Sequence, residues 1–138
     1  TRLVRDVTAL VRAARPGVRV SAAVYGKYPS SVDSVGQDWV EWLRKDWVDF
    51  VCPMNYTTNT AQFGSYVTTQ MALPEAAGKV YPGIGVTATE SRLDPVQVLD
   101  QVSALRKAGA PGFMLFDLNG VLEREVLSLF PLGLTRTP

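Results

Sequence analysis

The residues of this chain that could do chemistry are aromatic, amide and carboxylate side chains, with one methionine, placed where apolar runs end or in the loop that follows. They are Tyr25, Met54, Asn55, Tyr56, Glu90 and Asp117. Proteins bind sugars with aromatic faces and with hydrogen bonds from amides and carboxylates. A phosphate would need a basic cluster or a glycine-rich nest, and neither is evident. The set therefore favours a carbohydrate ligand.

Composition excludes several other chemistries. The chain contains no His, which rules out His general bases, Ser-His-Asp triads and His-ligated zinc. Gly83-Ile84-Gly85 lies inside a predicted strand rather than in a turn before a helix, so it indicates tight packing instead of a dinucleotide-binding loop. The net charge is +1, which gives no general attraction to nucleic acid. We expect neither a cofactor nor a metal.

Two further features concern the setting of the chain. Cys52 is the single cysteine and lies in an apolar run, so we predict a small buried side chain. No apolar run approaches the roughly 20 residues that span a membrane. The chain does not begin with Met and enters directly on a helical pattern, from which we expect a piece of a longer protein.

The elements that must position these residues follow from hydrophobic periodicity. Apolar runs bounded by turn residues predict strands at 18–25, 47–53, 80–86 and 112–117. Apolar residues at helical spacing predict helices at 3–14, 35–45, 60–71, 95–108 and 121–130. The segments 27–33 and 87–93 are predicted loops. We assign 1–131 to four αβ units and 132–138 to a tail.

Local signals set several helix starts. Ser34 with Gln37, and Asp94 with Gln97, have the spacing of a capping box. Thr60 is the predicted N-cap of the third helix.

Structural roles are the simpler interpretation for other notable residues. Asp49 precedes the apolar core of its strand, so it lies at the end of a parallel fold where residues contribute stability. Trp39, Trp42 and Trp47 are predicted core residues.

The order of the elements predicts a parallel α/β fold. Helices and strands alternate, and the strands begin about 30 residues apart, which is the repeat of a βα unit. The strands are apolar along their length, as in sheets covered by helices or in barrel cores. Two architectures fit: an open doubly wound sheet, or part of a (β/α)8 barrel. In both, the functional face lies at the carboxyl ends of the strands.

A family resemblance favours the barrel. The segment 37–43, with Trp39 and Trp42, and the run Val48-Asp49-Phe50-Val51-Cys52-Pro53-Met54-Asn55-Tyr56 resemble the glycosyl-hydrolase-like, family 10-like barrels. The segments 81–85 and 112–116 are similar to the next two strands of that family, and 53–56 is similar to a strand end of chitinase-type barrels. The resemblance covers residues 1 to about 130 and implies the C-terminal half of the barrel.

The resemblance also implies roles for the residues at the strand ends. Asn55 and Tyr56 would line the sugar-binding cleft, with Tyr25, Glu90 and Asp117 on the same face. Glycoside hydrolysis normally uses two carboxylates, and Asp117 and Glu90 are the two that can be placed near the cleft. We therefore predict Asp117 and Glu90 as catalytic, and Tyr25, Met54, Asn55 and Tyr56 as substrate-binding.

The expected function is a glycoside hydrolase-like barrel that acts on or binds a polysaccharide. The family's usual acidic motif at the end of the fourth barrel strand has no counterpart in this chain, so catalysis would need an N-terminal half. The alternative is a non-catalytic carbohydrate-binding or structural module. The resemblance implies a bacterial protein of the cell envelope or the extracellular space. We also expect self-association or pairing with the other half-barrel.

Overall fold

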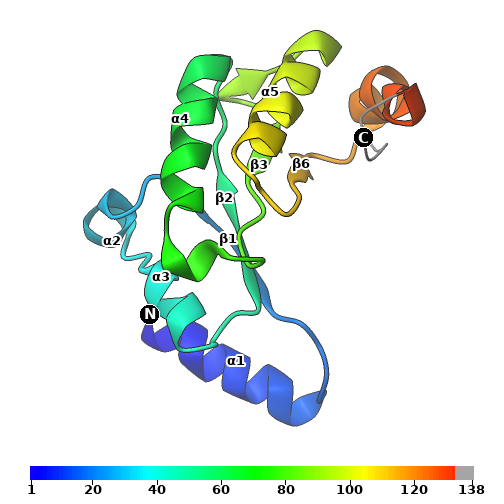
Figure 1. The fold of residues 1–138 in the computed structure, drawn as a ribbon. Coiled ribbons are helices and arrows are strands. Elements are labelled where there is room, and N and C mark those ends of the chain that lie inside the picture. The colour runs from blue at the N-terminus through cyan, green and yellow to red at the C-terminus, as the bar shows by residue number, and fades with distance from the viewer. Residues whose placement is uncertain (133–138) are drawn as a thin grey trace.

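The chain folds around a four-stranded parallel sheet. The computed structural model describes residues 1–132. The strands are β1 (Ser21–Tyr25), β2 (Phe50–Met54), β3 (Gly83–Gly85) and β6 (Met114–Phe116), arranged in the order β1-β2-β3-β6. Each strand lies beside the next strand of this sheet along the chain, without a reversal of order (Figure 1). The predicted parallel α/β fold class is confirmed.

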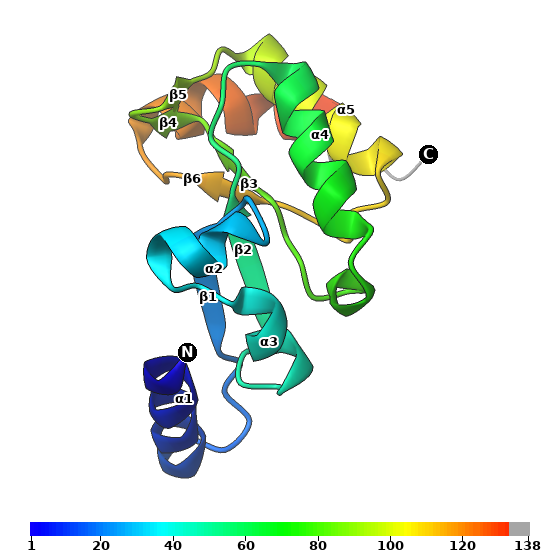
Figure 2. The same ribbon diagram turned by 90° about the vertical axis from the view of Figure 1, so that its left-hand side faces the viewer.

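Helices pack on one face of this sheet. They include α3 (Trp39–Arg44), α4 (Thr60–Met71) and α5 (Pro95–Lys107). One core cluster joins Phe63 and Val67 of α4 to Ile84 of β3 and to α5. A second core cluster joins α3 to Val24 of β1 and Val51 of β2. Figure 2 shows α4 and α5 side by side above the sheet.

The opposite face of the sheet is open among the described residues. The strand register aligns Tyr25, Met54, Gly83 and Met114, so the side chains of Tyr25, Met54 and Met114 share one face with the bare backbone of Gly83. Tyr25 is 54% exposed, and Met114 and Phe116 are each 47% exposed. We call this surface the open face, formed by Ser21, Ala23, Tyr25, Phe50, Cys52, Met54, Gly83, Gly85, Met114 and Phe116. Cys52 is only half-buried there, and burial raises the pKa of its thiol.

The segment between β1 and β2 differs from the prediction. The predicted loop contains a short helix, α2 (Ser30–Val35), and the predicted helix from residue 35 begins only at Trp39. Gly36 separates the two helices with φ = +67°, a conformation that favours glycine. The predicted N-cap at Ser34 is therefore wrong, because Ser34 lies inside α2 and its hydroxyl donates to the carbonyl of Ser30. Asp38 caps α3 instead.

Two later segments also differ. The predicted loop 87–93 is a hairpin of β4 (Thr87–Ala88) and β5 (Ser91–Arg92), which pair only with each other. The predicted last helix is a π-helical turn, η2 (Leu122–Val126), followed by a 3₁₀ segment, η3 (Leu127–Leu132). Pro131 inside η3 cannot donate a backbone hydrogen bond, which is consistent with this irregular ending. Most of the predicted tail lies outside the described residues.

Other local predictions are confirmed. Asp94 and Gln97 form the capping box of α5. Trp39 and Trp42 are buried in the core, and Trp47 packs partly buried against it. By contrast, the predicted N-cap of α4 at Thr60 is wrong by one residue, because Thr60 begins the helix and Asn59 caps it by accepting the Gln62 N–H.

The contacts of Asp49 agree with the structural role predicted for it. Its carboxylate accepts the backbone N–H of Val20 and pairs with Arg12 of α1 (Arg2–Ala14) at 3.1 Å. Of the helices described, none is both long and apolar enough to cross a membrane.

Candidate functional site

The carboxyl ends of the strands form two adjoining hollows. The Lys27 hollow has a volume of about 260 Å³ and is lined by Tyr25, Gly26, Lys27, Ser30, Ser31, Ser34, Met54, Asn55, Tyr56 and Tyr66. The Glu90 hollow has a volume of about 380 Å³ and is lined by Tyr25, Met54, Tyr56, Thr89, Glu90 and Phe116. Tyr25, Met54 and Tyr56 line both. All four residues predicted to bind substrate therefore lie at one site.

The aromatic ring of Tyr56 packs against Gly85 of β3 and stacks on Phe116. The two ring centroids are 5.4 Å apart with planes inclined by 25°. A Cβ atom added to Gly85 would lie 2.8 Å from the Tyr56 ring, so the glycine predicted to allow close packing admits this ring. Burial is the main cause that raises the pKa of the Tyr56 phenol, and the nearby Cys52, Glu90 and Asp117 groups raise it further. Tyr56 therefore stays a neutral hydrogen-bond donor.

Asn55 lies beneath the surface of the Lys27 hollow and is only 1% exposed. Its amide exchanges two hydrogen bonds with Gln70 of α4, of 2.9 and 2.8 Å. Gln70 Nε2 also donates to the Gly26 carbonyl at 2.8 Å. A side chain on Gly26 would collide with Asn55 Oδ1, so glycine is required there. These contacts fix the turn that follows β1.

Asp117 follows β6 and is half-buried. Its Oδ1 accepts hydrogen bonds from the Thr87 hydroxyl and from the Asn119 amide, the latter at 2.6 Å. Both partners also bond to each other at 2.8 Å, which fixes the orientation of the carboxylate. Asp117 does not line either hollow, but its charge acts on Tyr56.

Glu90 is exposed at the tip of the β4–β5 hairpin and lines the Glu90 hollow. Ser91 anchors this hairpin to the sheet, because its hydroxyl donates to the Gly85 carbonyl at 2.7 Å. The structure thus places both predicted carboxylates at the same edge as Tyr56, one on a hairpin and one on a strand end.

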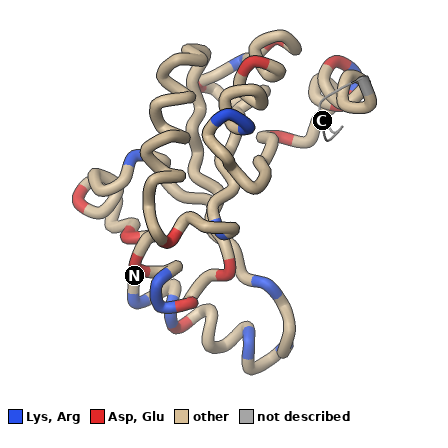
Figure 3. The backbone as a smooth tube through the Cα atoms, viewed as in Figure 1, with Lys and Arg blue, Asp and Glu red and all other residues tan. Residues whose placement is uncertain are grey.

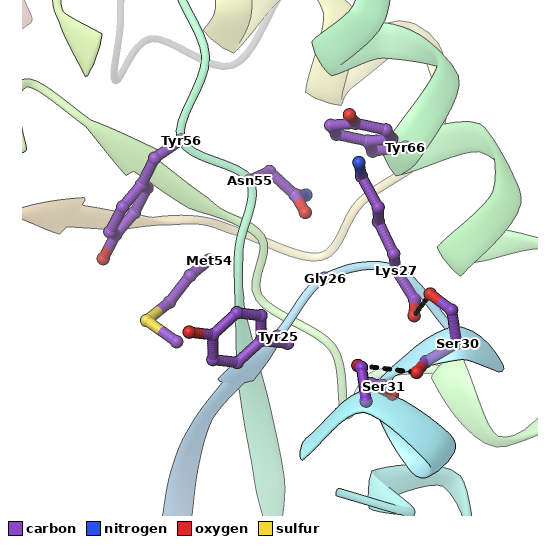
Figure 4. A pocket seen from close by; sticks show the side chains of 10 residues that line it. Tyr25, Gly26, Lys27, Ser30, Ser31, Met54, Asn55, Tyr56 and Tyr66 are labelled. Atoms are coloured by element: carbon purple, nitrogen blue, oxygen red, sulfur yellow. Dashed lines mark hydrogen bonds between the residues drawn. The ribbon is translucent and has the colours of Figure 1, made fainter. Parts of the chain in front are cut away.

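The sequence did not reveal several residues of the site. Tyr66 and Gln70 lie on α4, Phe116 is the last residue of β6, and Ser30, Ser31 and Ser34 lie on the unpredicted α2. Figure 4 shows the Lys27 side chain extending toward the Tyr66 ring, whose centroid lies 5.4 Å from Lys27 Nζ. The sequence does contain one indication of these residues: Tyr66 and Gln70 are spaced so that they share one face of α4.

The model of a family described as glycosyl hydrolase-like 10 matches residues 1–85, more than half of the chain. The chain belongs to this family. No curated protein and no solved structure matches the chain.

Membership of the glycosyl hydrolase-like 10 family confirms the resemblance and indicates a carbohydrate-related function. The matched stretch contains Tyr25, Lys27 and the Met54–Tyr56 segment of the site. Glu90 and Asp117 lie beyond it, so their predicted roles rest on their place in the fold.

Proposed function

We propose that this chain supplies the sugar-binding cleft of a glycoside hydrolase-like protein that acts on a polysaccharide. The observation that carries the proposal is the wall of Tyr25, Met54 and Tyr56 between two hollows at the carboxyl edge of a parallel sheet. Exposed aromatic rings beside hydrogen-bonding groups suit the apolar faces and hydroxyls of successive sugar units. Family membership supports the same ligand class.

In the catalytic form of this proposal, Asp117 and Glu90 contribute carboxylates to the reaction. Asp117 is held by Thr87 and Asn119, whereas Glu90 reaches the cleft from a hairpin. The neutral Tyr56 phenol lies under the influence of both charges and would donate a hydrogen bond to bound sugar.

We further propose that the sheet is half of a (β/α)8 barrel. The sequential strand order and the single helix-covered face support this arrangement, because a barrel needs both. The open face would then be the barrel interior, and catalysis would use groups from the other half.

A specific observation favours the alternative of sugar binding without catalysis. Among the described residues, Glu90 is the only carboxylate that lines either of these two hollows. Hydrolysis normally needs a second carboxylate about 5–9.5 Å from the first. A binding module needs only the aromatic wall and the polar groups around it.

The test compares turnover and binding in the full-length protein. Reducing-end release from a panel of polysaccharides is measured for wild type, Asp117→Asn, Glu90→Gln and the control Asp100→Asn, whose exposed residue lies on α5. Loss of about 100-fold or more in either site variant, with the control unchanged, supports catalysis by that residue. Binding without turnover in wild type supports the module, and absence of both binding and turnover refutes the proposed function.

A further inference from the structure

We propose that the Lys27 hollow selects a sugar unit carrying a negative charge, with Lys27 as the residue that determines this specificity. The inference rests on the proposed carbohydrate function and adds the charge of the ligand. Three observations support it: the position of Lys27, the groups around Lys27, and the separation of the Lys27 hollow from the Glu90 hollow.

The Lys27 ammonium group is held at the hollow by an aromatic ring. Lys27 follows β1 directly after Gly26, whose carbonyl is bound by Gln70 of α4. From this fixed turn the side chain extends to the face of Tyr66, with Nζ 5.4 Å from the ring centroid (Figure 4). A cation over an aromatic face is attracted to it and keeps its remaining N–H donors for a ligand.

No carboxylate of the described residues lines this hollow, and the nearest acidic residue along the chain, Asp33 of α2, is exposed and forms no ion pair with Lys27. Lys27 takes part in none of the ion pairs found among residues 1–132. The facing helix α4 contains neither acidic nor basic residues and is uniformly tan in Figure 3. Glu90 lines the other hollow, across the wall of Tyr25, Met54 and Tyr56. The positive charge is therefore available to an incoming anion.

The other polar groups of this hollow suit sugar hydroxyls. The hydroxyl of Ser30 donates to the Lys27 carbonyl at 2.9 Å, and that of Ser34 donates to the Ser30 carbonyl at 2.7 Å. Since their hydrogens are engaged, the serine oxygens remain as acceptors. The serine oxygens repel a carboxylate but accept hydrogen bonds from sugar hydroxyls. Lys27 is therefore the group that would bind the negative charge of the sugar. An anionic sugar matches both kinds of group.

The experiment measures binding of anionic polysaccharides beside neutral forms whose carboxylates are methyl-esterified. The probes are polygalacturonate, alginate and hyaluronan, each beside its methyl ester, together with a sulfated glucan that separates sulfate from carboxylate recognition. Affinity electrophoresis is run on the full-length protein as wild type, Lys27→Met, Lys27→Arg and the control Lys45→Met. Lys45 is an exposed lysine after α3, so this control makes the same charge change outside the hollow.

We expect wild type to bind at least one anionic form more tightly than its neutral partner. Lys27→Met should weaken that binding about five- to tenfold, the size of one partly exposed charged hydrogen bond, and should leave neutral binding within about twofold. Lys27→Arg should restore the preference, and Lys45→Met should not alter it. Salt should reduce the wild-type preference and have less effect on Lys27→Met.

Three outcomes overturn the inference. Equal binding of charged and neutral forms by wild type refutes charge selection while leaving the proposed function intact. A charge preference that survives in Lys27→Met refutes the role of Lys27. Binding of no saccharide refutes both this inference and the proposed function.

Discussion

Asn55 and Gln70 together determine the shape of the cleft floor. Both side chains are almost fully buried, and the two amides satisfy each other while Gln70 also binds the Gly26 carbonyl. A buried amide that loses its partner retains its desolvation cost without compensation. The pair therefore couples β2, α4 and the turn that carries Lys27.

Gln70→Met should lower the free energy of unfolding by about 1–3 kcal/mol, because it leaves the Asn55 amide and the Gly26 carbonyl without their partner. Asn55→Leu should cost a similar amount. The double variant should lose less than the sum of both, since neither amide then remains unpaired. Urea denaturation of the four proteins measures this coupling, and strict additivity would contradict it.

Gly85→Ala should be destabilising by about 1–3 kcal/mol, because the new methyl group meets Ser91 Oγ and the Tyr56 ring. Gly64→Ala is the matched control. It lies within α4 with only Ala104 near, at 3.9 Å, and should stabilise by about 0.5–1 kcal/mol. Thermal unfolding, followed by circular dichroism, measures the stability of both variants against wild type. Equal shifts for both variants would show that close packing at Gly85 is unimportant.

The site was predictable from sequence where it follows the strands directly. Tyr25, Asn55 and Tyr56 were found because parallel strands end at a common edge. Tyr66 and Gln70 could not be predicted, because their contacts depend on how α4 meets the turns that follow β1 and β2. The burial of Asn55 was also outside the reach of sequence, since an amide at a strand end looks the same whether it faces solvent or Gln70.

At the scale of elements, Asp49 ties the first helix to the sheet. Its carboxylate accepts the Val20 N–H before β1 and pairs with Arg12, which also donates to the Asp46 carbonyl at 2.7 Å. The Val20 hydrogen bond is the main cause that lowers the pKa of Asp49, with Arg12 adding to the effect.

Asp49→Asn should lower the free energy of unfolding at pH 7 by about 1 kcal/mol, because one charge-assisted hydrogen bond and a partly exposed ion pair are weakened. The pKa of Asp49 is lower in the folded chain than the ordinary value near 3.9. Its stabilisation is therefore fully present above about pH 4 and is lost as the pH falls through the folded-state pKa.

Urea denaturation between pH 2.5 and pH 7 measures this dependence. The difference between wild type and Asp49→Asn should shrink below about pH 4. Asp33→Asn on the exposed side of α2 is the control. A difference that persists unchanged at pH 2.5 would exclude the carboxylate as its source.

The long helices and the strands of the main sheet can be predicted from the sequence, whereas the short helices and the hairpin cannot. The periodic patterns of α1, α4 and α5 and the apolar runs of the four sheet strands are strong signals. The split of one predicted helix into α2 and α3 turns on Gly36, whose positive φ is decided by the fold around it. The β4–β5 hairpin has two residues per strand, too few to show alternation.

The open face is the main exposed apolar surface of the sheet. Residues from all four strands contribute to it, and β1 and β6 form its two edges. Edge strands with unpaired backbone groups favour further strand pairing. This surface supports the predicted association with a second copy or with another half-barrel, which remains a proposal.

This chain expressed alone should self-associate, and Met114→Lys on the open face should shift it toward monomer. A lysine buried in an interface between two open faces is unfavourable unless an acidic group pairs with it. Val96→Lys, at an exposed position on α5, is the control. Sedimentation velocity across a concentration series measures the effect. A monodisperse wild-type monomer would contradict the expectation.

The hairpin that carries Glu90 gives the cleft an adjustable rim. Because β4 and β5 pair only with each other, a longer or shorter tip would break no hydrogen bond of the main sheet. The depth of the cleft and the reach of its carboxylate can thus change independently of the scaffold. Relatives that differ in substrate length are expected to differ first in this hairpin.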